Sequence, residues 1–341
     1  MDKQVRDRFL FASAVTGALL AARAVVRARR AYDVRGKTVL ITGGSRGLGL
    51  VLARVLAREG ARLAICARDA AELERARADL AARGADVLAV PCDLTKRAQV
   101  EELVNDVRAH FGRIDVLINN AGVIQVGPID VMTLEDYEEA MRTHYWGPLY
   151  AILAVLPEMR ERGEGRIVNV SSVGGKISVP HLLPYSASKF ALTGLSEGLR
   201  AALVKDGVYV TTVCPGLMRT GSPRNASFKG QHRAEYAWFS ISDNLPVMSI
   251  SAERAARRIV AAFKRGDAET TVSLPTRIAV TFYSVFPGLG ADAVGLIERL
   301  LPGPDGAGTE VKRGAESRSA LSPSVLTVLG DRAALRNNEL R

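Results

Sequence analysis

The sequence is poor in the residues that build disulfides and metal centres. Its 341 residues include three cysteines, no CxxC pair and no cluster of cysteine with histidine. Cys66, Cys92 and Cys214 are far apart, and each lies at the end of a predicted strand. We therefore expect buried, reduced thiols, and the sequence offers neither a disulfide framework nor a metal site.

A long hydrophobic run is also missing from the N-terminal part of the chain. The charge-free run Phe9–Ala22 has fourteen residues, whereas a membrane-spanning helix needs ~20. Such a run could be a signal-peptide core, a short anchor or a helix lying in a membrane surface. We favour a hydrophobic and basic anchor segment over residues 1–35, with a helix packed on the protein itself as the alternative.

The net charge of +10 is concentrated in the same region. Residues 1–36 carry eight Lys or Arg against three Asp, which makes +5, half of the total. A nucleic-acid-binding protein would need a basic, aromatic-laced face on its folded domain, so we expect no nucleic-acid partner. Arginines directly after the hydrophobic run favour the cytoplasmic side for the rest of the chain. We expect membrane association through residues 1–30 with a cytoplasmic folded domain, or alternatively a soluble cytoplasmic protein.

Short apolar runs alternate with helical periods between residues 36 and 274. This alternation predicts an α/β domain with a doubly wound, Rossmann-type parallel sheet of about seven strands and helices on both faces. The predicted strands are Thr38–Thr42, Arg62–Cys66, Val87–Pro91, Val116–Asn119, Arg166–Val170, Val208–Cys214 and Thr270–Ser273. The predicted helices include Leu48–Arg58, Ala70–Arg83, Thr95–Phe111, Thr133–Arg160 and Pro184–Lys205.

Three segments fall outside the simple alternation. Residues 216–250 lack clear periodicity and follow a predicted strand, where a long loop is often a lid over a ligand crevice; an irregular surface excursion is the alternative. Residues 275–300 are apolar with few charges and predict a helical extension, whereas the polar, Gly/Pro/Ser-rich residues 301–341 predict a flexible tail. The lid residues that could meet an acidic group of a ligand, unless they are simply solvated, are Arg224, Lys229 and Arg233.

A glycine-rich loop follows the first predicted strand, in Thr42-Gly43-Gly44-Ser45-Arg46-Gly47-Leu48-Gly49. A strand, a glycine loop and an apolar-periodic helix in this order are the context of a phosphate-binding turn. Gly43 permits the tight turn, Gly47 lets the backbone approach a diphosphate, and Gly49 lets helix and strand pack closely. The pyrophosphate of a dinucleotide would then meet free N–H groups at the helix N-terminus.

The end of the second predicted strand indicates which dinucleotide is used. Ala67 stands where an acidic residue would bind a ribose 2′-hydroxyl, and Arg68 follows it. Arg68 and Arg46 are two guanidinium groups without a carboxylate, which suits a 2′-phosphate. Asp69 argues the other way, but we interpret it as the N-cap of the next helix. We therefore expect NADP(H).

By these and later motifs, the sequence resembles the short-chain dehydrogenase/reductase family over residues 36–274. The Cys-Asp-Leu-Thr run with Asp93 and Leu94 looks like the family's adenine-contacting element, and Ser172 precedes Tyr185 by the family's thirteen residues. Three further runs match the NNAG, YxxxK and PGxxxT elements, namely Asn119-Asn120-Ala121-Gly122, Tyr185-Ser186-Ala187-Ser188-Lys189 and Pro215-Gly216-Leu217-Met218-Arg219-Thr220. The residues that the loop and the resemblance assign to the cofactor are Thr42, Gly43, Ser45, Arg46, Gly47, Leu48, Gly49, Arg68, Asp93, Leu94, Asn120, Ala121, Gly122, Tyr185, Lys189, Pro215, Gly216 and Thr220.

The resemblance implies that Tyr185 is the general acid in reduction and the general base in oxidation. A free phenol has a pKa near ~10, and Lys189, four residues on along the same helix face, would lower it by proximity of charge. The matching lysine of the family also holds the nicotinamide ribose. Ser172 would donate a hydrogen bond to the substrate oxygen; Ser171 is the neighbouring candidate, which the spacing disfavours. Without these companions, Tyr185 and Lys189 would be an ordinary solvated helix pair.

One position departs from the family pattern. The family usually has Asn in an N-x-x-G element, where the side chain holds a water that leads to the lysine. Here the run is His144-Tyr145-Trp146-Gly147. His144 could preserve this proton path or change its pH response; alternatively, its side chain only packs and the backbone carbonyl does the work.

These features predict an NADP(H)-dependent oxidoreductase that interconverts a ketone and a secondary alcohol. The anchor segment and the apolar residues 275–300 favour a lipophilic substrate, by analogy with membrane-bound steroid and lipid reductases that the family contains. A cofactor-binding regulator or scaffold without turnover is the alternative, and only His144 supports it. Because family members commonly pair through two long helices beside the active site, we also expect a homodimer or homotetramer.

Overall fold

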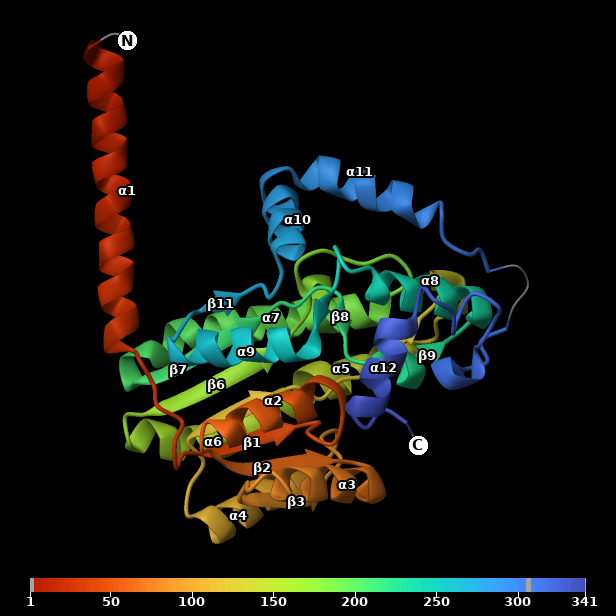
Figure 1. Ribbon diagram of the computed structural model, residues 1–341, viewed down its shortest axis with the longest axis horizontal. Helices are drawn as coiled ribbons and strands as arrows, with labels where there is room; N and C mark the ends of the chain where they lie inside the picture. Colours follow the sequence, from red (N-terminus) through yellow and green to blue (C-terminus); the bar gives the residue numbers. More distant parts are fainter. Residues whose placement is uncertain (1–2, 305–307, 341) are drawn as a thin grey trace.

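The structure, a computed structural model, describes residues 3–304 and 308–340. Its centre is a seven-stranded parallel sheet in the order β3-β2-β1-β4-β6-β7-β11, with helices on both faces (Figure 1). This arrangement confirms the predicted doubly wound fold. The strand order reverses between β1 and β4, and in such sheets ligands bind beyond the carboxyl ends of the strands at that point.

The seven strands fall on the predicted runs. They are β1 (Thr38–Thr42), β2 (Arg62–Ala67), β3 (Val87–Pro91), β4 (Val116–Asn119), β6 (Gly165–Val170), β7 (Val208–Val213) and β11 (Glu269–Thr270). The last strand ends before the predicted Ser273, because the Ser273 hydroxyl accepts a hydrogen bond from the Thr276 N–H at the start of a helix.

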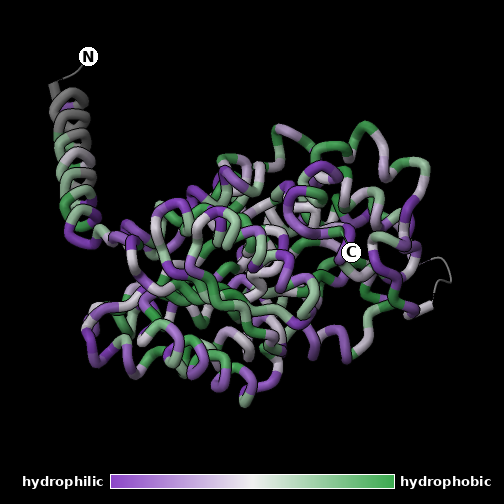
Figure 2. The backbone as a smooth tube through the Cα atoms, turned by 60° about the horizontal axis from the view of Figure 1, so that its bottom comes forward, coloured by the Kyte–Doolittle hydropathy of each residue, from purple (hydrophilic) through white to green (hydrophobic). Residues whose placement is uncertain are grey.

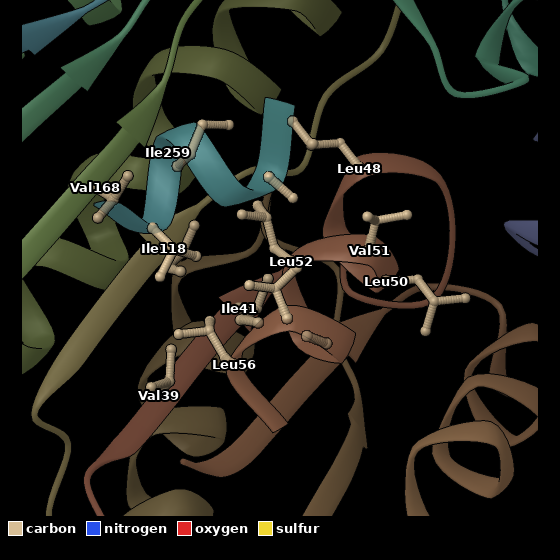
Figure 3. Close-up of a cluster of buried hydrophobic side chains, with 14 of the residues drawn as sticks. Val39, Ile41, Leu48, Leu50, Val51, Leu52, Leu56, Ile118, Val168 and Ile259 are labelled. Carbon is tan, nitrogen blue, oxygen red and sulfur yellow. The ribbon is translucent and has the colours of Figure 1, made fainter. Parts of the chain in front are cut away.

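Each strand of the sheet centre is buried on both faces, which explains its continuous apolar run. Val39 and Ile41 of β1 pack with one cluster of side chains, and Leu40 packs with the cluster on the opposite face. The first cluster lies under α2 (Gly47–Arg58), α3 (Ala70–Ala81) and α9 (Ala252–Lys264), and Figure 3 shows Ile259 of α9 and Leu52 of α2 converging over the strands. The second lies under α4 (Arg97–Phe111), α6 (Gly147–Glu161) and α7 (Leu183–Leu203). In Figure 2 the strands accordingly appear as a hydrophobic band through the centre of the body.

The predicted helix Thr133–Arg160 is two helices joined by an irregular turn. α5 (Leu134–Met141) ends in a π-helical turn, Arg142–Trp146, and α6 begins at Gly147. The Gly147 N–H donates to the Arg142 carbonyl five residues back, and the next residue, Pro148, has no N–H to continue the α-helical pattern. A π-turn inside a helix is frequent at functional sites, and this one carries His144.

Residues 216–250 are more regular than we expected. They contain β8 (Met218–Arg219), β9 (Ser227–Phe228), α8 (His232–Asn244) and β10 (Ile250–Ser251). α8 is packed by aromatic side chains: Tyr236 and Phe239 contact the buried ring of Phe228. Aromatic contacts rather than a clean helical period hold this segment in place.

The helices α10 (Leu274–Val285) and α11 (Pro287–Glu298) form an arch that stands off the body (Figure 1). Most of their large apolar side chains are exposed. These exposed residues are Leu274, Ile278, Phe282, Val285, Leu289, Leu296 and Ile297, and Phe286 between the two helices is also exposed.

The C-terminal segment differs from the flexible tail that we expected over residues 301–341. β12 (Lys312–Arg313) pairs with β9, and α12 (Val328–Arg336) contacts α8. Asn337 and Glu339 are 1% and 5% exposed. Much of this segment is held by hydrogen bonds to the domain rather than by an apolar face. Its polar composition therefore did not indicate that it packs on the domain.

The N-terminal helix α1 (Lys3–Arg29) projects from the body as a rod (Figures 1 and 2). At its base the Arg27 guanidinium lies 2.8 Å from the Asp267 carboxylate. Within residues 3–304 and 308–340, no helix is both long enough and apolar enough to cross a membrane.

Candidate active site

The glycine loop joins β1 to α2 and has the geometry that its glycines predict. Gly43 and Gly47 have φ values of +64° and +54°, a region that L-residues with side chains rarely adopt. At Gly49 a side chain would overlap the Gly43 carbonyl oxygen. The backbone conformation therefore favours glycine at Gly43 in the turn and at Gly47 at the start of α2. At Gly49, close packing of α2 against the loop leaves no room for a side chain.

The loop is tied to the neighbouring strand β4. The Thr42 hydroxyl accepts from the Asn120 N–H at 3.0 Å, and the Asn120 side-chain amide donates to the carbonyls of Thr42 and Gly43, each at 3.1 Å. Ala121 lies directly against Gly43. These contacts hold the phosphate loop and the Asn-Asn-Ala-Gly run side by side at the point where the strand order reverses.

Ser172 and Tyr185 face each other beyond the carboxyl end of β6. Ser172 follows β6, and its hydroxyl accepts from the Gly174 N–H at 3.0 Å and hydrogen-bonds to the Tyr185 phenol. The Ser171 hydroxyl points elsewhere, because it donates to the Lys189 carbonyl at 3.0 Å and meets the Thr193 hydroxyl at 2.8 Å. The geometry thus separates the two serines in the way that the spacing predicts.

Lys189 lies one turn of α7 after Tyr185, with its ammonium in the interior. The side chain is 4% exposed, and Nζ donates to the Val170 carbonyl at 2.8 Å. Burial lowers the pKa of Lys189 to about 7. Burial also raises the pKa of Tyr185 to about 12, although its hydrogen bond to Ser172 acts the other way. We expected Lys189 to lower the pKa of Tyr185; here Nζ lies 5.7 Å from the phenol ring centre, and desolvation of both groups outweighs the attraction.

The family model described as short chain dehydrogenase matches residues 37–229, which include all of these elements. The chain belongs to this family. Dehydrogenase/reductase SDR family member 7B from Bos taurus is 35% identical over 268 residues, covering 76% of this chain and 80% of the relative. The short-chain dehydrogenases and reductases are oxidoreductases, so the serine, tyrosine and lysine stand in an oxidoreductase scaffold.

Two solved structures with a similar fold contain nicotinamide nucleotides. An actinorhodin polyketide ketoreductase with NADPH has a TM-score of 0.63 at 31% identity, covering 71% of this chain and 97% of its own. A short chain dehydrogenase/reductase from Burkholderia phymatum in complex with NAD has a TM-score of 0.68 at 24% identity, covering 76% and 96%, and here the likeness concerns the fold alone. Similar structures therefore hold either NAD or NADPH.

His144, at the family's usual asparagine position, lies fully buried beside α7. Its Nε2 accepts from the Val123 N–H at 3.1 Å, so the neutral ring carries its hydrogen on Nδ1, which donates to the Ser188 hydroxyl at 2.8 Å. That hydroxyl in turn donates to the Tyr185 carbonyl at 2.8 Å. Burial, and secondarily the charge of Lys189, keep the pKa of His144 well below its ordinary value. A neutral ring with both nitrogens engaged suits positioning of the Tyr185 turn.

The remaining residues assigned to the cofactor line the same edge of the sheet. Leu94 approaches the start of α6 at Gly147, and Gly122 lies against His144 and Lys189. The Pro215 carbonyl accepts from the Val173 N–H at 2.7 Å, which brings the Pro-Gly segment beside Ser172. Its Gly216 leaves no room for a side chain because the Thr276 hydroxyl fills that space.

The predicted 2′-phosphate pocket contains an acid that sequence analysis missed. Asp69 is the N-cap of α3, as predicted, and accepts from the Glu72 N–H. Glu72 is 3% exposed, hydrogen-bonds to the Ser45 hydroxyl, and pairs with the Arg46 guanidinium at 2.9 Å. Arg68 is exposed at the end of β2, near Asp93. The Asp-x-x-Glu spacing signals a helix start, but nothing local signals that Glu72 reaches back to the glycine loop.

The C-terminus also reaches this loop, which sequence analysis did not predict. The Gly47 N–H donates to the Asn337 carbonyl at 2.9 Å, and the Asn338 amide donates to the Ser45 carbonyl at 2.9 Å. Glu339 lies with Oε2 3.4 Å from Arg46 Nε. Two sites expected to contact the cofactor, the loop and the first turn of α2, are thus in contact with the chain's own end.

Two of the three lid cations that could have met an acidic ligand are used internally instead, whereas Arg233 is exposed. Lys229 is 4% exposed and pairs with Asp136 at 2.5 Å, and Arg224 lies 3.7 Å from Asp331. These pairs connect the lid to α5 and α12. They do not support recognition of an acidic substrate by Lys229 or Arg224.

Proposed function

We propose that the protein is an NADP(H)-dependent oxidoreductase that interconverts a ketone and a secondary alcohol. The observation that carries the proposal is the position of the Tyr185 phenol: it hydrogen-bonds to Ser172 and lies one helical turn from buried Lys189. All three lie at the sheet edge where the glycine loop and the Asn-Asn-Ala-Gly run meet. A proton donor beside a dinucleotide cradle is the arrangement that carbonyl reduction requires.

The residues of the loop fit a dinucleotide. Gly47 and Gly49 carry no side chains at the start of α2, and helix N-terminal N–H groups bind diphosphates. Thr42 and Asn120 hold the loop against β4. Lys189 and the Pro215–Thr220 segment would hold the nicotinamide half. When bound, the nicotinamide supplies or accepts the hydride.

The chain's own residues would supply the proton and the orientation. A pKa raised to about 12 keeps the Tyr185 hydroxyl protonated at neutral pH, which is the form needed to donate a proton to the oxygen of a ketone. The Ser172 hydroxyl would hold that oxygen by a second hydrogen bond. Lys189 would stabilise the phenolate left after the transfer, and His144, through Ser188, would position the turn that carries Tyr185.

Two arginines support NADP(H) over NAD(H). Arg46 and Arg68 lie at the ends of the glycine loop and β2, where a 2′-phosphate would be recognised. Glu72, already paired with Arg46, opposes a second anion there. The preference therefore depends on whether Arg46 exchanges Glu72 for the phosphate, with the exposed Arg68 as a second cation directly after β2.

The exposed apolar side chains of α10 and α11 support a lipophilic substrate and contact with a membrane surface. α1 carries the apolar run and its flanking arginines, and we propose that residues 1–30 lie on the membrane with the catalytic domain on the cytoplasmic side. Exposed Leu153 of α6 and Phe190 of α7 support a homodimer or homotetramer through these helices.

Titration with NADPH and, separately, NADH tests the proposal through quenching of nicotinamide fluorescence. We expect NADPH to bind at least about tenfold more tightly, which corresponds to ~1.4 kcal/mol. Tighter NADH binding would contradict the cofactor assignment while leaving the oxidoreductase assignment intact.

A Tyr185→Phe variant tests the catalytic assignment. Removal of the hydroxyl should reduce turnover of a lipophilic ketone by at least ~100-fold and leave NADPH affinity within a factor of about two. If the wild type binds NADPH but reduces no ketone, and Tyr185→Phe changes nothing, the alternative of a cofactor-binding regulator or scaffold is correct.

A further inference from the structure

The last residues of the chain lie in the space that the glycine loop leaves open for a diphosphate. Because Gly47 has no side chain, a phosphate can approach the backbone at the start of α2. A Cβ atom added to Gly47 would lie 2.5 Å from Glu339 Oε1. The Gly47 N–H, one of the helix N-terminal donors without an intrahelical partner, is taken by the Asn337 carbonyl at 2.9 Å.

Glu339 of this segment places a carboxyl group where a phosphate would lie; burial raises the pKa of Glu339 to about 7, and Arg46 and Asn225 act the other way. Glu339 is 5% exposed, and its carboxylate lies 3.4 Å from the guanidinium of Arg46. Above this pKa the carboxylate is negative, and a negative group at a helix N-terminus is favoured by the helix dipole. The carboxylate of Glu339 therefore uses the same loop, helix end and arginine that we assign to the anionic part of the cofactor.

Side-chain amides hold the segment in this position. Asn338 donates to the carbonyls of Ser45 and Glu72, each at 2.9 Å, and accepts from Arg75 Nε at 3.0 Å. Asn338 has a φ of +57°, a conformation that asparagine tolerates better than most residues. None of these contacts involves the catalytic serine, tyrosine or lysine.

A second set of contacts joins the segment to the other predicted cofactor element. The Asn337 amide donates to the Thr220 carbonyl at 3.2 Å, and Ala334 of α12 packs against Gly221. Asn225 donates to the Glu339 carboxylate at 2.6 Å. The C-terminus thus bridges the glycine loop and the Pro-Gly segment, the two elements between which a dinucleotide would lie.

The geometry points to an autoinhibitory plug: residues 337–340 occupy the phosphate cradle, and a dinucleotide enters only when they leave it. This inference rests on the proposed function and adds regulation of the same site. Because plug and cofactor compete, the apparent dissociation constant equals the intrinsic one divided by the fraction of unplugged molecules. Anything that draws the C-terminus away, a membrane surface or a partner included, would activate the enzyme.

The test is a titration of the full-length protein with NADPH, followed by fluorescence quenching. Two variants loosen the plug without touching the catalytic groups: Asn338→Ala removes the amide contacts, and Glu339→Gln removes the charge. Glu310→Gln is the matched control, because Glu310 is exposed in the same segment and pairs with Lys312. We expect the dissociation constant for NADPH to fall by roughly three- to tenfold in both plug variants and to stay unchanged in the control.

Hydrogen exchange of residues 328–340 gives a readout that does not depend on catalysis. A displaced plug exchanges faster when NADPH is added to the wild type, whereas a segment that closes over bound cofactor exchanges more slowly. Equal or weaker NADPH binding by both variants, or slower exchange of the C-terminus, would overturn the plug while leaving the proposed function intact. Absence of NADPH and NADH binding in the wild type and in both loosened variants would instead refute the dinucleotide site itself.

Discussion

Replacing Lys189 with methionine should stabilise the cofactor-free protein while removing its activity. The Lys189 ammonium is 4% exposed, and burial lowers its pKa from 10.5 to about 7, with a weak opposing influence from Cys214. Methionine has a similar length and no charge, so it fills the space without a buried cation. Burial of the Lys189 ammonium lowers stability, and the proposed reaction needs this group. Its removal should therefore raise stability and lower activity.

The expected magnitude follows from the proton linkage. The folded-state pKa of Lys189 lies below its unfolded value, so between pH 7 and pH 10.5 the unfolded chain binds more protons than the native one. The wild type therefore gains stability as the pH rises through this window and carries the full penalty below it. A tenfold change in a protonation constant corresponds to about 1.4 kcal/mol, which sets an upper limit of ~5 kcal/mol. We expect at least ~2 kcal/mol, because a protein relaxes around a buried charge.

Urea unfolding of the wild type and Lys189→Met at several values between pH 6 and pH 10 measures the effect. The variant should be more stable at pH 6, and the difference should shrink steadily towards pH 10. Lys205→Met, at an exposed position just after the end of α7, controls for the loss of one positive charge. Parallel pH profiles for wild type and Lys189→Met would refute the reasoning, since a pure packing effect does not depend on pH.

Three further substitutions test the packing of the fold by chemical denaturation. Gly49→Ala should destabilise the fold by at least ~2 kcal/mol, because its methyl would overlap the Gly43 carbonyl; Gly295→Ala in α11, where nothing lies within 4 Å, should instead add about 0.5 kcal/mol or more. Equal effects of the two would contradict the close packing assigned to the loop. Asp115→Ala should cost ~2–4 kcal/mol, because buried Asp115 accepts from the Thr38 N–H at 2.9 Å and pairs with Arg113 at 2.8 Å; a loss below ~0.5 kcal/mol would show that these bonds are replaced by water.

The sheet was predictable because its strands follow a local rule. A run such as Thr38–Thr42 is buried on both faces, so five successive residues are buried and the pattern is visible without knowledge of the neighbours. The order of the motifs then places the glycine loop and the Asn-Asn-Ala-Gly run at one edge. Tyr185 and Lys189 share a helix face by spacing alone, and Ser172 comes near them because a strand ends just before it.

The pKa values of the site were not predictable in the same way. We expected Lys189 to lower the pKa of Tyr185 from the proximity of charge, yet in the structure both groups are buried and each is driven towards its neutral form. The sequence shows which residues are close, whereas desolvation depends on everything packed around them. The helix break at Arg142–Trp146 escaped prediction for a related reason, since the apolar period continues through it.

The contacts to the glycine loop that sequence analysis missed come from residues far apart in the sequence. Glu72 reaches the glycine loop from the next helix, and Asn337 and Glu339 reach it from the end of the chain, well beyond the residues 37–229 that match the family. Polar segments of this kind carry no periodicity, because they are held by specific hydrogen bonds rather than by an apolar face. Strand burial constrains the core that matches the family. A polar terminus on the glycine loop is held by single side chains instead, so one asparagine or one carboxylate can decide whether it binds there. Asn338 and Glu339 are therefore the positions at which small changes should tune cofactor affinity without altering the catalytic groups.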